Sequence, residues 1–308
     1  MFCSSFHVRK NGRRNNRQRY LCLDCGKQFQ TKNKSELTKR IWNDYVFGKQ
    51  SYQQLSDKHK LTVKTIRRRI ENVGFNTPTI KPGKVVLGID TCFYGHEFGV
   101  SVFRGVIKRV NLLWRFVNTE TQETYINGIQ ELQQQGWIIL CLIVDGKNLS
   151  LGEKLNLPVQ MCHFHQLAII KRYLTTNPKL LASQQLKQIA ELLSKTTEQK
   201  FIQLLNAWYS RWSDFLKEKT KVAGTSRWFY AHKRTRSAYR SLRANGPYLF
   251  TFERLRKQGV NCPKTNNSLE GSFAHLKDKV RLHRGLKLNR KLRLINQILA
   301  GKTSRFYH

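Results

Sequence analysis

The chain has 308 residues, of which 40% are hydrophobic and 11% aromatic, so a folded core is expected and global disorder is excluded. Its 56 lysines and arginines outnumber the 19 aspartates and glutamates, and the net charge is +37. Such a charge repels itself unless a polyanion binds, which favours a nucleic-acid partner. The longest apolar run, Trp137 to Val144, is too short to span a membrane, and no secretory signal is visible. We expect a soluble cytoplasmic protein.

The first two segments of the chain are basic. Residues 1–31 are loop-like and contain Cys22 and Cys25. Residues 34–75 have helical spacing and match a helix-turn-helix, with Ser51 and Thr62 as helix caps. Its second helix would face DNA with Lys64, Thr65, Arg67, Arg68 and Arg69, the alternative being an ordinary solvated helical hairpin.

A large domain follows a Pro- and Gly-containing linker over residues 76–83. Alternating strand and helix patterns predict an α/β domain with a mixed sheet. The expected strands are Lys84 to Asp90, Phe98 to Arg104, Arg109 to Asn118, Trp137 to Asp145 and Val159 to Cys162, with a helix from Thr121 to Gln135.

Residues 165–257 have a helical pattern, and the chain closes with a basic tail from Lys277 to Arg305. Trp228 lies among aromatic and basic residues in the helical stretch. Packing in a helical core is the favoured interpretation of this tryptophan. The alternative is stacking on an unpaired DNA base, as aromatic residues with arginine do.

Three carboxylates are candidates for catalysis. Asp90 and Asp145 each close an apolar strand, and two such groups side by side would repel unless a divalent cation lies between them. Taken singly, each aspartate fits a simple turn. Glu270 follows Asn267 by three residues, which equally fits a helix capping box.

These residues carry a resemblance to a known family. Gly88-Ile-Asp90, Val144-Asp145-Gly146, Cys162-His-Phe-His165 and Asn266-Asn-Ser-Leu-Glu270-Gly271 occur in an order that resembles the DDE transposases of bacterial insertion sequences, in the Mutator-like group. The resemblance covers roughly Val85 to Lys287. It implies a ribonuclease H-like core whose first part spans residues 84–164, a helical insertion over 165–260, and a catalytic helix with a basic tail over 261–308.

The resemblance also implies roles for individual residues. Asp90, Asp145 and Glu270 would be catalytic and would bind two Mg²⁺ or Mn²⁺ ions. Cys162 and His165 would support the active site; the residues alone fit a half-buried cysteine and a capping histidine better than a zinc site. The implied partners are double-stranded DNA at element ends and at the target, in a homodimer or higher oligomer associated with the nucleoid.

The first segment resembles the zinc ribbon that precedes many such transposases. Cys22 and Cys25 match its second knuckle, and Cys3 matches one cysteine of the first. The fourth cysteine would lie before Met1, so we expect weak zinc binding or an upstream start, and His7 has the wrong spacing to replace it. The predicted activity is metal-dependent DNA cleavage and strand transfer; the alternatives are a DNA-binding regulator and a structure-specific nuclease.

Overall fold

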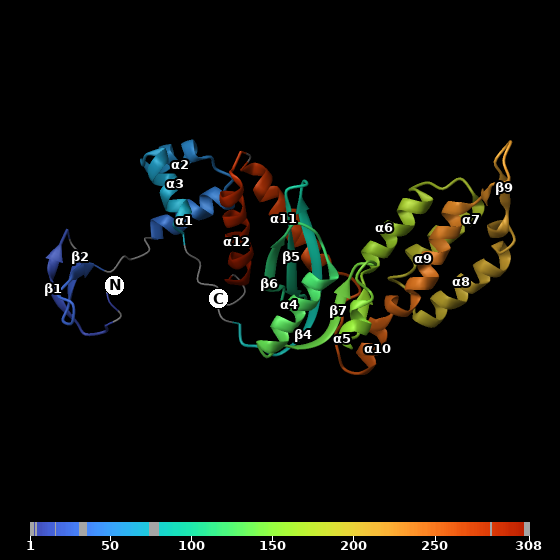
Figure 1. Ribbon diagram of the computed structural model, residues 1–308, viewed down its shortest axis with the longest axis horizontal. Coiled ribbons are helices and arrows are strands. Elements are labelled where there is room, and N and C mark those ends of the chain that lie inside the picture. Colours follow the sequence, from blue (N-terminus) through green and yellow to red (C-terminus); the bar gives the residue numbers. More distant parts are fainter. Residues whose placement is uncertain are drawn as a thin grey trace. The chain divides into compact units, whose positions relative to one another are not determined.

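The computed structural model describes residues 3, 5–15, 17–30, 36–73, 80–283 and 285–304. The chain divides into two compact units (Figure 1). The first contains Met1–Phe75 and Lys279–Leu292, and the second contains Asn76–Asp278 and Arg293–His308. Most of the expected linker before residue 80 lies outside the described residues.

The first unit begins with a small antiparallel sheet in the order β1-β2-β3, formed by Val8–Arg14, Arg17–Cys22 and Gln28–Gln30. The prediction that this segment is loop-like is therefore wrong. Most side chains of β1 are exposed, so its sequence lacks the alternation of apolar and polar residues that marks a half-buried strand. Backbone pairing with β2 defines the strand instead.

Three short helices follow: α1 (Glu36–Val46), α2 (Tyr52–His59) and α3 (Val63–Glu71). Ser51 forms a capping box with Gln54 at the start of α2, and the Thr62 hydroxyl accepts the Thr65 N–H at the start of α3. Both predicted caps are confirmed. The apolar faces of the helices are fully buried and form their shared core, through Ile41, Val46, Leu55 and Ile66.

The second unit is built on a five-stranded mixed sheet in the order β6-β5-β4-β7-β8. β4 pairs antiparallel with β5, β5 pairs antiparallel with β6, and β7 and β8 run parallel to β4. The predicted strands are confirmed as Lys84–Tyr94 (β4), Phe98–Gly105 (β5), Val110–Val117 (β6), Ile138–Val144 (β7) and Val159–Met161 (β8). Helix α4 (Gln122–Gln134) buries Tyr125, Ile129 and Leu132 in one cluster with residues of the sheet.

The helical part of the second unit follows β8. It contains α6 (His163–Leu174), α7 (Leu181–Glu191), α8 (Glu198–Trp212), the 3-10 turn η1 (Phe215–Lys217), α9 (Lys233–Leu249) and α10 (Thr251–Lys257), while the short α5 (Leu151–Leu155) precedes β8. Between η1 and α9 the chain forms a hairpin of β9 (Lys219–Lys221) and β10 (Trp228–Tyr230). The prediction of helix throughout this region is wrong at the hairpin.

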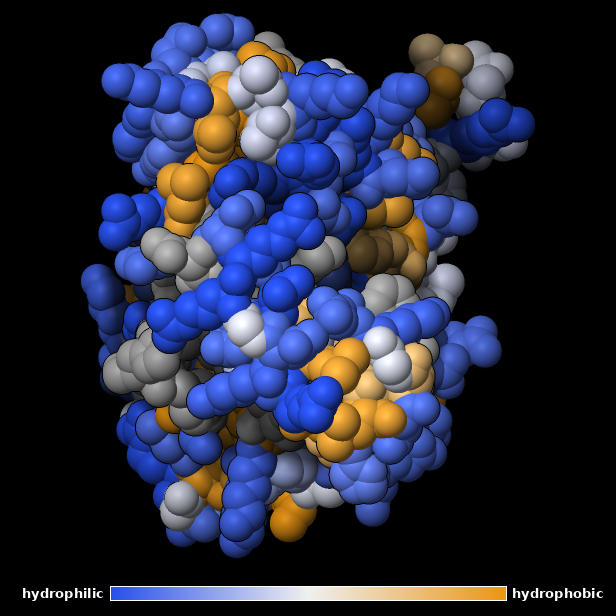
Figure 2. All heavy atoms as spheres, turned by 90° about the vertical axis from the view of Figure 1, so that its left-hand side faces the viewer, coloured by the Kyte–Doolittle hydropathy of each residue, from blue (hydrophilic) through white to orange (hydrophobic). Residues whose placement is uncertain are grey.

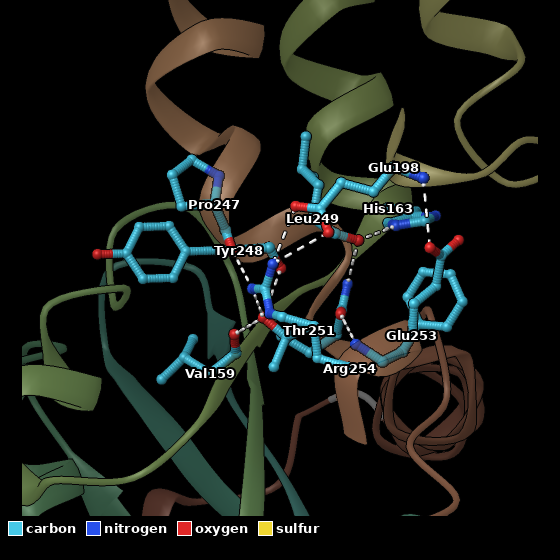
Figure 3. A network of polar contacts seen from close by, with 11 residues as sticks. Val159, His163, Glu198, Pro247, Tyr248, Leu249, Thr251, Glu253 and Arg254 are labelled. Carbon is cyan, nitrogen blue, oxygen red and sulfur yellow. Dashed lines mark hydrogen bonds and ion pairs between the residues drawn. The ribbon is translucent and has the colours of Figure 1, made fainter. Parts of the chain in front are cut away.

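A polar network joins the α9–α10 junction to the sheet and to α6 (Figure 3). The Thr251 hydroxyl donates to the Val159 carbonyl of β8 over 2.7 Å. His163 Nε2, at the start of α6, lies 2.7 Å from the Leu249 carbonyl. Arg254 pairs with Glu198 of α8 at 2.9 Å. Since these contacts fix the start of α6, they also fix Cys162, the residue immediately before it.

The predicted basic tail is helical. Residues up to 282 belong to α11 (Asn267–Leu282), and α12 spans Leu288–Ser304. One face of α12 is buried and contains Leu294, Ile295, Ile298 and Leu299. The Leu299 carbonyl accepts from Asn111 of β6 at 3.2 Å. The many cations of this segment obscured the apolar spacing of an amphipathic helix.

Hydrophilic side chains dominate the face shown in Figure 2, where apolar residues gather only in small patches. Among the described residues, no helix combines the length and apolar character that crossing a membrane requires.

Candidate functional site

Asp90 and Asp145 are brought together by the register of two parallel strands. Gly88 of β4 pairs with Ile143 of β7, so two residues further along Asp90 and Asp145 lie beside each other on the same face. β4 does not end at Asp90 as predicted; it continues to Tyr94 with β5 as its neighbour. Asp90 therefore stands where the shorter β7 stops pairing.

The surroundings of Asp90 disfavour its charge. Burial raises its pKa to about 6, and the negative charges of Asp145 and Glu120 act in the same direction. The Thr91 N–H, which donates to Asp90 Oδ1 over 2.8 Å, and the charge of His165 act against this increase. Without a metal ion, ionised Asp90 is therefore energetically unfavourable at neutral pH, and a bound cation would stabilise it.

Asp145 is held by the loop that follows β7. The Asn148 side chain, which is 5% exposed, donates to Asp145 Oδ1 over 2.8 Å, and the Lys147 N–H donates over 3.2 Å. Both contacts go to the same oxygen. They orient the carboxylate without a counter-charge on that oxygen, which suits a group that binds a cation.

Glu120 is a fourth carboxylate that the sequence reasoning missed. It follows β6, whose carboxyl end lies at the same sheet edge as those of β4 and β7. The Tyr125 hydroxyl donates to Glu120 Oε1 over 2.7 Å, and the Asn148 amide lies within 3.4 Å. The only signal in the sequence was an acid a few residues after the expected strand that ends at Asn118, a weaker form of the pattern that singled out Asp90 and Asp145.

Glu270 lies in the first turn of α11 and faces α6. The Cys162 thiol donates to Glu270 Oε1 over 3.6 Å, and His165 Nδ1 lies 3.7 Å from the same oxygen. Burial raises the pKa of Cys162 to about 11, so the thiol remains a hydrogen-bond donor at neutral pH. The interpretation of Cys162 as half-buried is wrong, because it is fully buried at the cap position of α6.

The capping-box interpretation of Glu270 is also wrong. The Asn266 carbonyl accepts the Glu270 N–H over 3.1 Å, so the cap position belongs to Asn266 and Asn267 is the first residue of the helix. The Asn266 N–H donates to Cys162 Sγ over 3.2 Å. The start of α11 is thus anchored to the residue that also contacts the carboxylate of Glu270.

A glycine allows α11 to approach the sheet. A Cβ added to Gly88 would lie 2.3 Å from Asn266 Oδ1 and 2.7 Å from the Val106 side chain. Gly88 and Asp90 share one face of β4 because side chains alternate along a strand. The absence of a side chain at Gly88 therefore brings the start of α11 onto the face that carries Asp90.

The carboxylates of Asp90, Asp145 and Glu270 do not all lie close enough to bind one metal ion together. In the described part of the chain, the metal-ligand groups whose atoms lie within 4.8 Å of one another are Cys162 with His165 and Glu270, and the three N-terminal cysteines. Carboxylate oxygens suit Mg²⁺ or Mn²⁺, and Asp90 offers them from β4 and Asp145 from the position directly after β7. Sharing one ion with Glu270 requires side-chain rearrangement.

Replacing Asp90 with Asn should stabilise the metal-free protein. Because the pKa of Asp90 is raised, the stability that its protonated form provides is lost as the pH rises through about 6. Asparagine carries no charge, so Asp90→Asn removes this loss. We expect the free energy of unfolding to increase by about 1–3 kcal/mol at pH 7.5 with chelator present. Thermal unfolding checks it, with the exposed Asp214→Asn as the matched control. A lower melting temperature for Asp90→Asn would contradict the account.

The predicted DNA-facing residues of α3 differ in exposure. Lys64, Arg67 and Arg68 are exposed, and the Arg67 guanidinium lies 5.4 Å from the Tyr52 ring centroid. Arg69 is half-buried and donates to the Thr38 hydroxyl of α1 over 3.2 Å. The first three side chains remain accessible to a partner, whereas Arg69 also connects two helices.

Trp228 does not pack in a helical core, so that interpretation is wrong. It lies in β10 and is 50% exposed, next to Phe229, which is 48% exposed. The Lys219 ammonium from the paired strand lies 3.9 Å from the centre of the Trp228 ring. The hairpin thus presents aromatic faces together with cations.

The N-terminal cysteines form a compact group. Their sulfur atoms lie within 4.8 Å of one another, and those of Cys3 and Cys22 are 3.5 Å apart. Backbone N–H groups of Cys25 and Asp24 lower the pKa of Cys22 to about 7, which favours the thiolate that zinc binds. His7 lies outside this group, and its Nδ1 is 3.4 Å from Asp24 Oδ1. The three thiols fit an incomplete zinc site.

We expect Zn²⁺ to bind at one equivalent with lower affinity than a four-ligand site, because one coordination position falls to water. Cys22→Ser should abolish binding, whereas His7→Ala should leave it unchanged. Metal analysis after equilibrium dialysis of the purified chain measures both. Loss of zinc on the histidine substitution would show that His7 completes the site.

Comparisons with known proteins add the following. No protein-family model matches the chain, and no curated protein matches its sequence. Among solved structures, the chain is similar to the Drosophila P element transposase strand transfer complex, with a TM-score of 0.48 and 13% sequence identity over 92% of this chain and 95% of that chain.

Proposed function

We propose that the protein is a DDE transposase that cleaves DNA and joins the released end to a target. The observation that carries the proposal is the register of β4 and β7, by which Asp90 in β4 lies beside Asp145 directly after β7, with the start of α11 packed against the same face. The sheet order, three antiparallel strands followed by two parallel ones, supports the ribonuclease H-like core that the sequence resemblance implies.

In the proposed reaction, water attacks a phosphodiester at the element end and releases a 3′-hydroxyl, which then attacks target DNA. Mg²⁺ or Mn²⁺, when bound, would activate the attacking oxygen and stabilise the leaving oxygen. Asp90 and Asp145 would hold the ions from the sheet edge. Glu270, oriented by Cys162 and His165, would complete the site from α11. Positioning and charge neutralisation suffice, so no covalent enzyme intermediate is needed.

DNA binding would use surfaces on both units. Lys64, Arg67 and Arg68 on α3 are exposed for a major groove, and Trp228 in the β-hairpin offers a face for an unpaired base. The net charge of +37 supports a polyanionic partner. Because two element ends must be held together, we propose a homodimer or higher oligomer on DNA.

A combined cleavage and strand-transfer assay tests the proposal. The purified chain is incubated with Mg²⁺ and DNA that carries the sequences flanking its gene. Metal-dependent nicks with 3′-hydroxyl ends and their transfer to a second duplex are the expected result. Cleavage without joining would identify a nuclease, and binding without cleavage a DNA-binding regulator; either outcome would overturn the proposal.

The α3 arginines should control binding to the element ends. Arg67→Ala/Arg68→Ala should weaken binding and reduce the slope of log K against log salt by about one for each phosphate that the variant no longer neutralises. Fluorescence anisotropy over a salt series measures the slope. Lys39→Ala/Arg40→Ala on α1 removes two exposed cations in the same unit and serves as the control. An unchanged slope in the α3 variant would show that these arginines do not bind phosphate.

A further inference from the structure

The helical part of the second unit contains an open cavity of about 550 Å³. Tyr209 of α8 and Leu216 of η1 form one part of its lining, and α9 contributes the rest. Arg236, Arg240 and Arg243 reach it from one face of α9, because residues four and seven positions apart in a helix lie on the same side. None of the carboxylates of the candidate active site lines this cavity.

The charged residues that line the cavity are all positively charged. No aspartate or glutamate lines it, and none of its three arginines forms an ion pair with a carboxylate in the described part of the chain. Arg236 donates to the Leu216 carbonyl over 3.2 Å, and its Nε is buried without a hydrogen-bond partner. Arg240 and Arg243 are exposed. Three arginines therefore line one cavity that has no carboxylate among its lining residues.

Stacked aromatic rings stabilise the wall that carries these groups. The rings of Tyr209 and Tyr239 are 4.8 Å apart and inclined by only 9°, and the Arg236 guanidinium lies 3.9 Å from the Tyr230 ring centroid. Arg243 donates to the Tyr239 hydroxyl at 3.5 Å. These contacts limit the movement of two of the three arginines, so little conformational freedom is lost when an anion binds.

We propose that this cavity is a phosphate-binding site. The planar fork of arginine matches the oxygens of phosphate, and several forks around one opening favour a phosphate group over a single carboxylate. The volume lies within the range of small-ligand sites, so a phosphate together with its sugar fits. The phosphate comes either from the DNA backbone, a source that rests on the proposed function, or from a free anion.

The test uses the full chain with chelator present, so that no cleavage occurs. Inorganic pyrophosphate is titrated by calorimetry at constant ionic strength, and duplex DNA is titrated over a salt series. Arg240→Gln/Arg243→Gln is compared with Arg256→Gln/Lys257→Gln, which removes two exposed cations from α10 of the same unit. Circular dichroism confirms that each variant folds.

We expect pyrophosphate to bind the Arg240→Gln/Arg243→Gln variant at least tenfold more weakly than it binds the wild type or the control. If the slope of log K for DNA binding against log salt falls by about two in the same variant, the bound phosphate belongs to the DNA backbone. If that slope is unchanged, the phosphate is a free anion. Equal binding of both probes to variant and wild type overturns the proposal. This experiment does not measure cleavage. If the protein fails the cleavage assay but pyrophosphate still binds the variant more weakly than the wild type, the proposed function is refuted and the phosphate-binding site stands.

Discussion

Asp145→Asn is expected to abolish DNA cleavage while DNA binding is retained. The substitution keeps the size of the side chain and its hydrogen bond from the Lys147 N–H, but it removes the charge that would hold a cation beside Asp90. Loss of a metal ligand removes several kcal/mol of transition-state stabilisation, which corresponds to a rate decrease of about 10³-fold or more. Single-turnover cleavage with Mg²⁺ measures the rate, and anisotropy measures the binding.

The exposed Asp214→Asn is the matched control, because it changes the net charge equally outside the candidate site. It should cleave at the wild-type rate. Equal loss of binding and cleavage in Asp145→Asn would indicate a role in folding or DNA contact and would argue against catalysis.

Gly88→Ala is expected to produce the largest loss among substitutions that remove no functional group. The added methyl would collide with the side chains of Asn266 and Val106, so the buried Asn266 side chain must shift, and we expect the start of α11 to move with it. Overpacking of this kind costs about 1–3 kcal/mol of stability. Because the movement displaces Glu270 from the face that carries Asp90, cleavage should fall much further than the stability change alone explains.

The comparison with Gly83→Ala isolates this effect. Gly83 immediately precedes the same strand, and a Cβ there would meet nothing within 4 Å. Thermal unfolding and single-turnover cleavage are measured for both variants at a temperature where both are folded. Wild-type cleavage by Gly88→Ala would show that the close approach of Asn266 does not position the site.

Much of the second unit could be predicted from local patterns. The apolar runs that became β4 and β7 end near acidic residues, and this pattern singled out Asp90 and Asp145 before any pairing was known. It did not single out Glu120, which lies three residues beyond the end of β6 and directly before Thr121, the cap of α4. The caps of α2 and α3 were predictable because capping depends on residues within one turn.

The sequence by itself determined the strongly basic character of the chain, the α/β alternation around Asp90 and Asp145, and the short helices with their caps. These features depend on composition and on neighbours within a few residues. Tertiary structure alone decided that Trp228 lies on an exposed hairpin, that one face of the basic helix α12 is buried, and that Cys162 and His165 contact Glu270. Each of these outcomes depends on strand register or on packing between segments distant in the chain, and local periodicity carries no information about such contacts.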